Sequence, residues 1–505
     1  MKQLRICFTT DTHGFFFPTN FYSAAERDLP MGLIRLANGF HKDENTLILD
    51  GGDTLQGSPL THYLSKRGAA PIAAFMNLAG YDYVVPGNHD FNYGVDYLAE
   101  YLNAVHAKSL CTNIRDKEGL LPLQSVALHT LPNGLRIALF GACTHHILRW
   151  EAQQTLDRLH IDPPIPRLQA ALAALKEEVD LRVCIYHGGF EADPDTGKRL
   201  TDSDENQAYE IAQTLGFDIL LTGHQHIALP GRYIGNTYVV QNTNAAMDYC
   251  EIKVDWDEDS GRIAAIRSRH VPPAAYCPAL AAPLLPAYEA VERWLDQPLG
   301  QLSCALRPLP PLQSALEGSL IANFVNQIQL AEGGCMLSAC SLANEIKGLE
   351  ATVSVRDVLS TYVYSNTLLV LELDGRRLKA YMERSAAYFA LRDGTVCVSE
   401  DFLLPKVAHY NYDYFYGLDY AIDLRRPVGE RIVRMDYRGR AIQPEDRVSI
   451  IVNSYRASGT GGYDMLLGAA VRKDIQKEVS ALIIEQLERH SFFQVDEHIP
   501  YRVLW

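Results

Sequence analysis

The chain has 505 residues, more than one ordinary hydrophobic core holds, so we expect two domains. Its 47% hydrophobic and 21% charged residues are typical of a globular protein and argue against a fibrous or largely disordered chain. The net charge of -15 at pH 7 argues against a general partner of nucleic acid polymers, whose phosphates such a surface repels. This net charge is compatible with a small phosphorylated substrate, because a metal cluster can dominate the electrostatic field at one site.

The lack of a recognisable targeting signal and the scattered cysteines favour a cytoplasmic protein. No charged segment with an apolar stretch and a cleavage site comes before the first motif, and no apolar run approaches the roughly 18 residues of a membrane span. The ten cysteines are scattered, and Cys7, Cys143 and Cys184 stand in apolar runs, as buried reduced thiols do. We therefore expect no membrane partner, and the sequence leaves the oligomeric state open.

Short apolar runs alternate with helical patterns through the first 270 residues. We predict strands at residues 4–10, 46–49, 83–85, 136–143, 181–186, 218–221 and 238–241, and helices at residues 32–41, 71–79 and 206–215. This alternation predicts a layered α/β domain. Residues 249–270 then alternate apolar and polar side chains around Asp259-Ser260-Gly261, which predicts a hairpin that closes the domain.

A passage rich in proline and alanine, residues 271–286, marks the end of this domain, and residues 287–295 have the pattern of a short helix. We therefore divide the chain into a first domain (1–270), a linker with a short helix (271–298) and a second domain (299–505).

Five short polar motifs each follow one of the predicted strands. They are Asp11-Thr12-His13, Gly51-Gly52-Asp53, Gly87-Asn88-His89-Asp90, Tyr186-His187-Gly188 and Gly223-His224-Gln225-His226. Loops beyond the carboxyl ends of strands converge in open α/β sheets, so these side chains are expected to meet. Carboxylate, imidazole and amide ligands suit Mn, Fe, Zn or Co. A single histidine is usually a satisfied core residue, as we expect for His145 and His146, but five motifs in this arrangement predict a metal site.

With these motifs the sequence resembles the calcineurin-like metallophosphoesterases, and specifically the 5′-nucleotidase family with its separate C-terminal domain. The resemblance spans essentially the whole chain and includes Gln56-Gly57-Ser58-Pro59 and Glu205-Asn206-Gln207-Ala208-Tyr209. It implies a four-layer α/β sandwich followed by a C-terminal α/β domain that recognises the nucleotide. It also implies two divalent metal ions in the first domain and an active site between the domains.

The resemblance assigns seven residues to the two metals. Asp11, His13, Asp53 and His226 would hold the first metal, Asp53 would bridge, and Asn88, His187 and His224 would complete the second. Two metals about 3.5–4 Å apart can clamp a phosphoryl group and activate a water for in-line displacement.

His89 lies next to a ligand but is not itself a ligand in the family pattern. Its expected role is to stabilise charge on the phosphoryl or leaving group, with general acid catalysis as one form of that role. Many 5′-nucleotidases orient this histidine with an aspartate three residues later, where this chain has Asn92. The string Gly-Asn-His-Asp-Phe-Asn-Tyr-Gly at residues 87–94 is similar to the 2′,3′-cyclic-nucleotide 2′-phosphodiesterase/3′-nucleotidase branch.

Two tyrosine-containing segments in the second half match the base-binding segments of the family. Tyr412, with Tyr410 as a near competitor, and Tyr455 would sandwich the nucleobase, a contact worth about 1–3 kcal/mol per base. Gly459 and Gly461 follow Tyr455 and permit close approach of a ligand. The alternative is that the tyrosines belong to a strand and the glycines to an ordinary turn.

Two further departures concern the substrate. Residues 338–343 lack the arginine of the family's Gly-Gly-x-Arg segment, and Gly461 stands where the family carries an aspartate for the ribose hydroxyls. We therefore predict a two-metal hydrolase of small nucleotides that acts as a 2′,3′-cyclic-nucleotide 2′-phosphodiesterase/3′-nucleotidase. A 5′-nucleotidase or nucleotide-sugar hydrolase is the enzymatic alternative, and a non-catalytic nucleotide-binding or sensor protein is the alternative of another class. Metal analysis with a generic phosphodiester assay separates these classes.

Overall fold

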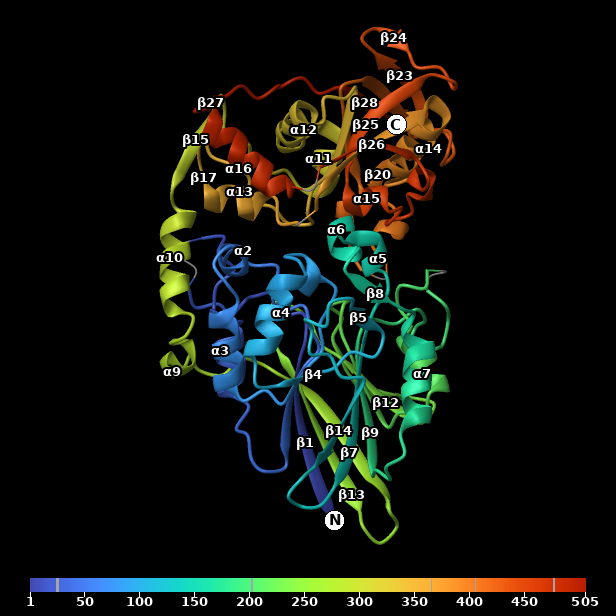
Figure 1. Cartoon of the computed structure of the whole chain (residues 1–505). Helices are drawn as coiled ribbons and strands as arrows, with labels where there is room; N and C mark the ends of the chain where they lie inside the picture. Colours follow the sequence, from blue (N-terminus) through green and yellow to red (C-terminus); the bar gives the residue numbers. More distant parts are fainter. Residues whose placement is uncertain (24–26, 201–202, 365, 405, 476) are drawn as a thin grey trace. The chain divides into compact units, whose positions relative to one another are not determined.

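The computed structural model describes residues 1–23, 27–200, 203–364, 366–404, 406–475 and 477–505. The chain forms two compact units, Met1–Glu292 and Arg293–Trp505, and their division falls within the segment 271–298 that the sequence marks as a linker. Figure 1 shows both units coloured along the sequence. Among the described residues, the structure contains no helix with the length and apolar character that crossing a membrane requires.

The first unit contains two six-stranded sheets. The first sheet consists, in spatial order, of β14 (Arg262–Val271), β13 (Tyr249–Asp257), β1 (Lys2–Thr9), β2 (Thr46–Asp50), β3 (Tyr83–Val84) and β4 (Lys108–Ser109). The second consists of β11 (Leu229–Ile234), β12 (Thr237–Gln241), β10 (Ile219–Thr222), β9 (Leu181–His187), β7 (Arg136–Cys143) and β6 (Val126–Thr130). The strands β1 to β4 run parallel, as do β7, β9, β10 and β12. The predicted hairpin is confirmed as the antiparallel pair β13 and β14 at one edge.

The two sheets bury one face against each other and the opposite faces beneath helical segments. In β1, Ile6 and Phe8 belong to the core between the sheets, while Cys7 on the other face contacts the carbonyl of Phe40. The outer face of the second sheet packs against Leu168 and Ile211, which come from the helices named below. The period-two alternation along each strand thus produces the expected four-layer sandwich.

The helices and short strands of this unit lie between successive strands of the two sheets along the chain, or follow the last of them (Figure 1). They are α1 (Leu33–Asn38), α2 (Pro59–Ser65), α3 (Ala70–Ala79), α4 (Val95–Ala104), α5 (Ile147–Trp150), α6 (Gln153–Leu156), α7 (Pro164–Ala174), α8 (Ala208–Thr214), α9 (Pro278–Ala281), β5 (Ile114–Asp116) and β8 (Leu159–Ile161). The predicted linker helix is α10 (Leu285–Leu295).

The second unit is built on one mixed five-stranded sheet. Its strands are, in spatial order, β21 (Asp413–Tyr416), β16 (Leu337–Ser341), β25 (Arg447–Asn453), β18 (Leu368–Asp374) and β26 (Ala470–Ile475). Its larger helices are α11 (Pro311–Glu317), α12 (Leu320–Gly333), α13 (Val355–Thr361), α14 (Gly375–Ala386) and α16 (Val479–Arg489). Smaller sheets contain β15 (Pro298–Leu302), β17 (Thr352–Ser354) and β27 (Phe492–Phe493); β19 (Phe389–Arg392) and β20 (Thr395–Val398); and β22 (Asp419–Asp423), β23 (Ile432–Tyr437), β24 (Arg440–Ala441) and β28 (Tyr501–Leu504).

The parallel strands determine where the polar motifs of the first unit lie. In the first sheet, β1, β2 and β3 are each followed within a few residues by one of the first three motifs. In the second sheet, His187 is the last residue of β9, and the fifth motif follows β10 directly. All five motifs therefore stand at carboxyl ends of strands, where side chains from different strands can converge.

Candidate metal centre

Two clusters of potential metal ligands lie at these strand ends. The first contains Asp11, His13 and His226, and the second contains Asp53, His187 and His224. Within each cluster the ligand atoms lie within 4.8 Å of one another. Four of the five motifs, which span more than two hundred residues of sequence, thus supply two adjoining three-residue groups. Asn88 of the third motif lies beside the second group.

Asp53 links the two clusters, and Asn88 adds a further potential ligand to the second. Asp53 Oδ2 lies 3.2 Å from His187 Nε2 and 3.9 Å from His13 Nε2, so this carboxylate faces both groups. Asn88 Oδ1 lies 3.1 Å from His187 Nε2 and 2.9 Å from His224 Nδ1. All seven residues that the family resemblance assigns to metals therefore occupy one connected site.

The tautomers of three histidines show that this site fits cations. The Nδ1 atoms of His13 and His187 face the carbonyls of Gln56 and Gly51 at 3.0 and 2.7 Å. A carbonyl only accepts, so each of these nitrogens carries a proton, and in the neutral ring Nε2 then carries the lone pair. His224 donates through Nε2 to the Glu205 carboxylate at 2.8 Å, which leaves its Nδ1 lone pair facing inward.

These inward-facing nitrogens lie close to other potential ligand atoms. The Nε2 atoms of His13 and His226 are 3.1 Å apart, and the Nε2 of His187 faces oxygens of Asp53 and Asn88. Nitrogen and oxygen lone pairs at these distances repel one another unless a proton or a metal cation lies between them. Histidines whose second nitrogen is held by a carbonyl or a carboxylate are typical metal ligands. The donor set therefore fits divalent metal ions.

The pKa shifts at the site also indicate that it favours positive charge. Burial opposes charge on His187, yet the carboxylates of Asp53 and Asp11 raise the pKa of its imidazole to about 10. Burial alone would raise the pKa of Asp11, but the imidazoles of His226 and His187 lower it to about 2. Two almost fully buried carboxylates stabilise positive charge placed between them.

The backbone at the ligands is strained. Five of the seven have positive φ angles between 49° and 72°, a region that residues with a side chain rarely adopt: Asp11, His13, Asp53, His224 and His226. Such conformations cost about 1–3 kcal/mol each and are typical of functional sites. They are held here by direct backbone hydrogen bonds, from Asp11 to Gly52 at 2.8 Å and from His13 to Asp53 at 2.7 Å.

Asp90 holds two of the ligand loops together, a role that the sequence pattern did not reveal. Its carboxylate accepts from the backbone amides of Asp53, Thr54, Leu55 and Gly87 at 2.8–2.9 Å. A Cβ atom at Gly87 would lie 2.2 Å from the carboxylate of Asp53, so glycine is required for this approach. Asp90 belongs to the third motif, so the sequence did mark its position. Its buried role was not predicted, because an aspartate in a turn is usually exposed.

His89 lies beside the clusters without belonging to either. Its backbone amide donates to Asp53 Oδ1 at 2.8 Å, and its ring centroid is 5.5 Å from that of His13. Its Nδ1 lies 2.8 Å from the amide oxygen of Asn92, whose Nδ2 in turn donates to the carboxylate of Glu151 at 2.9 Å. The structure thus places His89 and Asn92 in contact at the edge of the metal centre.

A third group of potential ligands contains His145, His146 and Asp204. Both imidazoles contact the Asp204 carboxylate through Nε2, at 3.1 and 2.7 Å. Hydrogen bonds between the two imidazoles and one carboxylate account for this group. These hydrogen bonds hold Asp204 in place. Its neighbour Glu205 accepts the hydrogen bond from His224.

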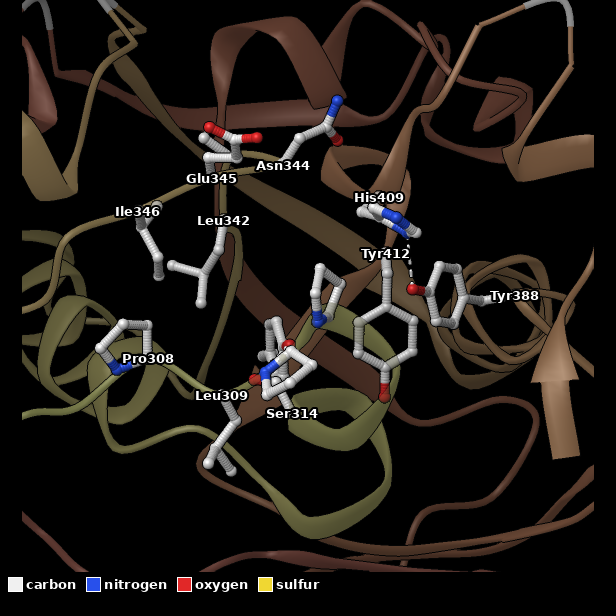
Figure 2. A pocket seen from close by; sticks show the side chains of 14 residues that line it. Pro308, Leu309, Ser314, Leu342, Asn344, Glu345, Ile346, Tyr388, His409 and Tyr412 are labelled. Atoms are coloured by element: carbon white, nitrogen blue, oxygen red, sulfur yellow. Dashed lines mark hydrogen bonds between the residues drawn. The ribbon is translucent and has the colours of Figure 1, made fainter.

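In the second unit, Tyr412 is almost fully buried, with 3% of its surface exposed. Its ring packs against those of Tyr388 and Tyr414, with centroids 5.0 and 4.9 Å apart. It lines a pocket of about 280 Å³ together with Leu342 and His409, as Figure 2 shows. The hydroxyl of Tyr388 and Nδ1 of His409 are 2.7 Å apart at one side of this pocket.

Tyr410 and Tyr455 lie in a different place, next to Tyr364. The ring of Tyr410 meets that of Tyr364 edge to face, with centroids 6.3 Å apart, and Tyr410 and Tyr455 are both partly exposed. Burial raises the pKa of Tyr364 well above its ordinary value, and the neighbouring hydroxyls of Tyr410 and Tyr455 raise it further. The two tyrosines therefore flank a common neighbour.

A buried ion pair joins the two tyrosine segments. Arg456, which is 1% exposed, donates through Nε and Nη2 to the carboxylate of Asp413 at 2.7 and 2.9 Å. It also donates to the carbonyls of Tyr410 and Thr460 at 3.0 and 2.9 Å. A Cβ atom at Gly461 would lie 2.5 Å from Asn411 Oδ1 and 2.7 Å from Arg456 Nη1, so a side chain there would displace these groups.

Gly459 is placed by the helix before it. It follows the short helix α15 (Ser454–Ala457), and its φ of 82° is the left-handed conformation that commonly ends a helix. Gly459 and Gly461 thus both have local structural roles.

Comparison with known proteins matches both units. A family model described as calcineurin-like phosphoesterase matches residues 4–228, and one described as 5′-nucleotidase, C-terminal domain, matches residues 307–468. A crystal structure of a Staphylococcus aureus protein assigned as a 5′-nucleotidase, in complex with alpha-ketoglutarate, is 30% identical, with a TM-score of 0.91 and coverage of 100% of both chains. A 2′,3′-cyclic-nucleotide 2′-phosphodiesterase/3′-nucleotidase of Haemophilus influenzae is 24% identical over 90% of this chain and 80% of its own. A 5′-nucleotidase precursor of Thermus thermophilus shares the fold at 20% identity, with a TM-score of 0.69 and coverage of 100% of this chain and 99% of its own.

The two sheets, their convergent strand ends and the paired ligand clusters define a metallophosphoesterase, an enzyme that hydrolyses phosphoric esters. Because the second unit matches as well, the chain belongs to the 5′-nucleotidase family of the calcineurin-like phosphoesterases.

Proposed function

We propose that this chain hydrolyses phosphate esters of small nucleotides and acts as a 2′,3′-cyclic-nucleotide 2′-phosphodiesterase/3′-nucleotidase. The observation that carries the proposal is the pair of adjoining ligand clusters, in which histidine ring nitrogens lie 2.9–3.2 Å from oxygens and nitrogens of other potential ligands. Divalent Mn, Fe, Zn or Co at this site would polarise the phosphoryl group and supply an activated water. Asp11, His13, Asp53 and His226 would hold one ion, and Asn88, His187 and His224, with the shared Asp53, the other.

His89 provides the proton-transfer group in this proposal. Its Nδ1 is engaged by Asn92, so its Nε2 remains to interact with the phosphoryl or leaving oxygen. A positioned acid or base of this kind contributes about 10²–10⁴-fold to a rate. Because His89 is held by its own contacts with Asp53 and Asn92, its loss is expected to slow chemistry without emptying the metal sites.

Three features favour cyclic and 3′-nucleotides over 5′-nucleotides. Asn92 replaces the aspartate of many 5′-nucleotidases, residues 338–343 carry no arginine, and Gly461 stands where the family carries a ribose-binding aspartate. Relatives from Haemophilus influenzae and Salmonella typhimurium that carry the cyclic phosphodiesterase name match 90% of this chain. A 5′-nucleotidase is the second candidate, favoured by the 30% identity to the Staphylococcus aureus protein.

We further propose that Tyr410 and Tyr455 hold the nucleobase. Tyr410 has exposed surface and shares the neighbour Tyr364 with Tyr455, whereas Tyr412 is enclosed by other aromatic rings. Stacking between aromatic faces tolerates different bases, so a broad base preference is expected. The pocket beside Tyr412 (Figure 2) is the alternative base site.

A cytoplasmic location is part of the same proposal. All ten cysteines are free thiols in the structure, and six of them are buried, which is typical of proteins from reducing compartments. Cell fractionation with an antibody to the chain tests the location, and recovery with the periplasmic or secreted fraction would contradict it.

A substrate panel tests the function. Purified chain loaded with Mn²⁺ is assayed with 2′,3′-cyclic AMP, 3′-AMP, 5′-AMP, a nucleotide sugar and bis(p-nitrophenyl) phosphate. We expect kcat/KM for the cyclic nucleotide or 3′-AMP to exceed that for 5′-AMP by about tenfold or more, which corresponds to about 1.4 kcal/mol in the transition state. If 5′-AMP is the best substrate, the chain is a 5′-nucleotidase, and if no ester is cut it is a binding protein.

A further inference from the structure

Glu151 lies behind the pair formed by His89 and Asn92. The oxygen of the Asn92 amide lies 2.8 Å from His89 Nδ1, and its nitrogen donates to Glu151 Oε2 at 2.9 Å. Asn92 therefore bridges an imidazole and a carboxylate that are far apart in the sequence. The carboxyl group that many relatives place directly beside this histidine is present here one residue further away.

The position of Glu151 is built into the fold. It directly follows α5, whose Trp150 ring stacks on the ring of His224 at a centroid distance of 5.6 Å and an angle of 25°. Its second oxygen, Oε1, accepts from the backbone amide of Ala152 at 2.8 Å. Both carboxylate oxygens are thus engaged, and burial raises the pKa of Glu151 to about 7.

When Glu151 is ionised, the hydrogen bonds have only one consistent direction. An ionised carboxylate only accepts, so the Asn92 atom that faces Glu151 must be the amide nitrogen. The amide oxygen then faces His89, and the ring must donate to it through Nδ1–H. If Asn92 turned over, its oxygen would face the carboxylate oxygen and its NH₂ group would face His89, which would favour the opposite tautomer.

We infer that Glu151 is a positioning residue: through Asn92 it fixes the orientation and tautomer of His89, so that Nε2 is presented to the reacting phosphate. Acting through the amide of Asn92, its carboxylate takes the place of the aspartate that the chain lacks at position 92. This inference rests on the proposed catalytic role of His89. It predicts that the carboxylate can be moved from position 151 to position 92 with function retained.

An exchange of the two side chains is the test. The variants are Glu151→Leu, Asn92→Asp/Glu151→Gln, His89→Asn, and Glu191→Gln as the matched control. Glu191 is a similarly buried carboxylate of the same unit that accepts from the backbone amides of Tyr209 and Glu210 at the start of α8. Turnover of 2′,3′-cyclic AMP, KM and metal content are measured at about pH 8, where a carboxyl of pKa about 7 is ionised.

Glu151→Leu is expected to lower kcat by about 10–100-fold, the usual effect of removing the partner that orients a functional histidine. KM and metal content should stay within about twofold of wild type, because neither ligands nor base contacts change. The exchanged variant should recover kcat to within about threefold of wild type. In that variant the carboxylate at position 92 would accept from His89 directly, and the amide at position 151 would donate to that carboxylate. Glu191→Gln should leave kcat unchanged.

Three results would overturn the inference: unchanged kcat in Glu151→Leu, an exchanged variant no more active than Glu151→Leu, or a loss of kcat that follows a loss of metal. The first two leave the proposed function intact as long as His89→Asn is impaired. If His89→Asn turns over at the wild-type rate, the catalytic role of His89 itself is wrong.

Discussion

The buried pair of Arg456 and Asp413 gives the most quantitative prediction for the second unit. Replacing Arg456 with Met removes the charge while keeping most of the volume, and leaves Asp413, 2% exposed, without its ionic partner. Breaking a buried ion pair in this way costs about 3–5 kcal/mol. For a unit of about 200 residues that corresponds to a fall in Tm of about 6–20 °C.

Calorimetry of the full chain measures this effect as a shift in the transition of the second unit. Arg440→Met is the control, because the Arg440–Asp446 pair is exposed and should contribute less than about 1 kcal/mol. The double variant Arg456→Met/Asp413→Asn should recover part of the loss, since it leaves no unpaired buried charge. A shift for Arg456→Met no larger than that for Arg440→Met would refute the reasoning.

The remaining predictions concern the metal site, the base site and pH. Asp53→Asn should lower kcat at least about 10³-fold because it removes the carboxylate that both clusters share. Asp218→Asn, at the amino end of β10, is the control and should leave kcat unchanged. Wild-type turnover in Asp53→Asn would contradict the assignment. Tyr410→Leu should raise KM for nucleotides about 5–150-fold, because it removes about 1–3 kcal/mol of stacking, and should leave hydrolysis of bis(p-nitrophenyl) phosphate unchanged. Tyr412→Leu should mainly reduce stability, because its ring is buried among other rings. The reverse pattern would favour the pocket of Figure 2 as the base site. Burial lowers the pKa of His62 to about 4, so the free energy of unfolding should fall as pH drops from about 6.5 to about 4, and urea titrations should show a smaller fall for His62→Gln. Equal falls in the two proteins would exclude His62 as the cause.

Much of the fold and the list of ligands could be predicted from the sequence because both depend on local patterns. The run at residues 136–143 is a strand with those bounds, and the hairpin at residues 249–270 forms with a turn at Gly261. The ligand motifs were recognisable because glycine, histidine and aspartate follow strand ends, and parallel strands bring such ends together.

The contacts that support these ligands could not be predicted in this way, because they depend on tertiary packing. Glu151 reaches Asn92 only because α5 packs Trp150 on His224, and no local pattern distinguishes it from a surface glutamate. The choice between Tyr410 and Tyr412 depends on which ring the core encloses. An alternating strand pattern identifies that one of two faces is buried, but not which face is left for a ligand.

The central claim, a two-metal centre that performs the hydrolysis, is tested most directly by metal stoichiometry measured together with activity. Chain stripped with a chelator is titrated with Mn²⁺, and bound metal per chain is determined alongside turnover of 2′,3′-cyclic AMP. Seven ligands in two adjoining clusters predict two ions per chain, no turnover in the stripped protein, and activity that returns as the sites fill. Full turnover in metal-free protein, or with a single ion per chain, would contradict the account.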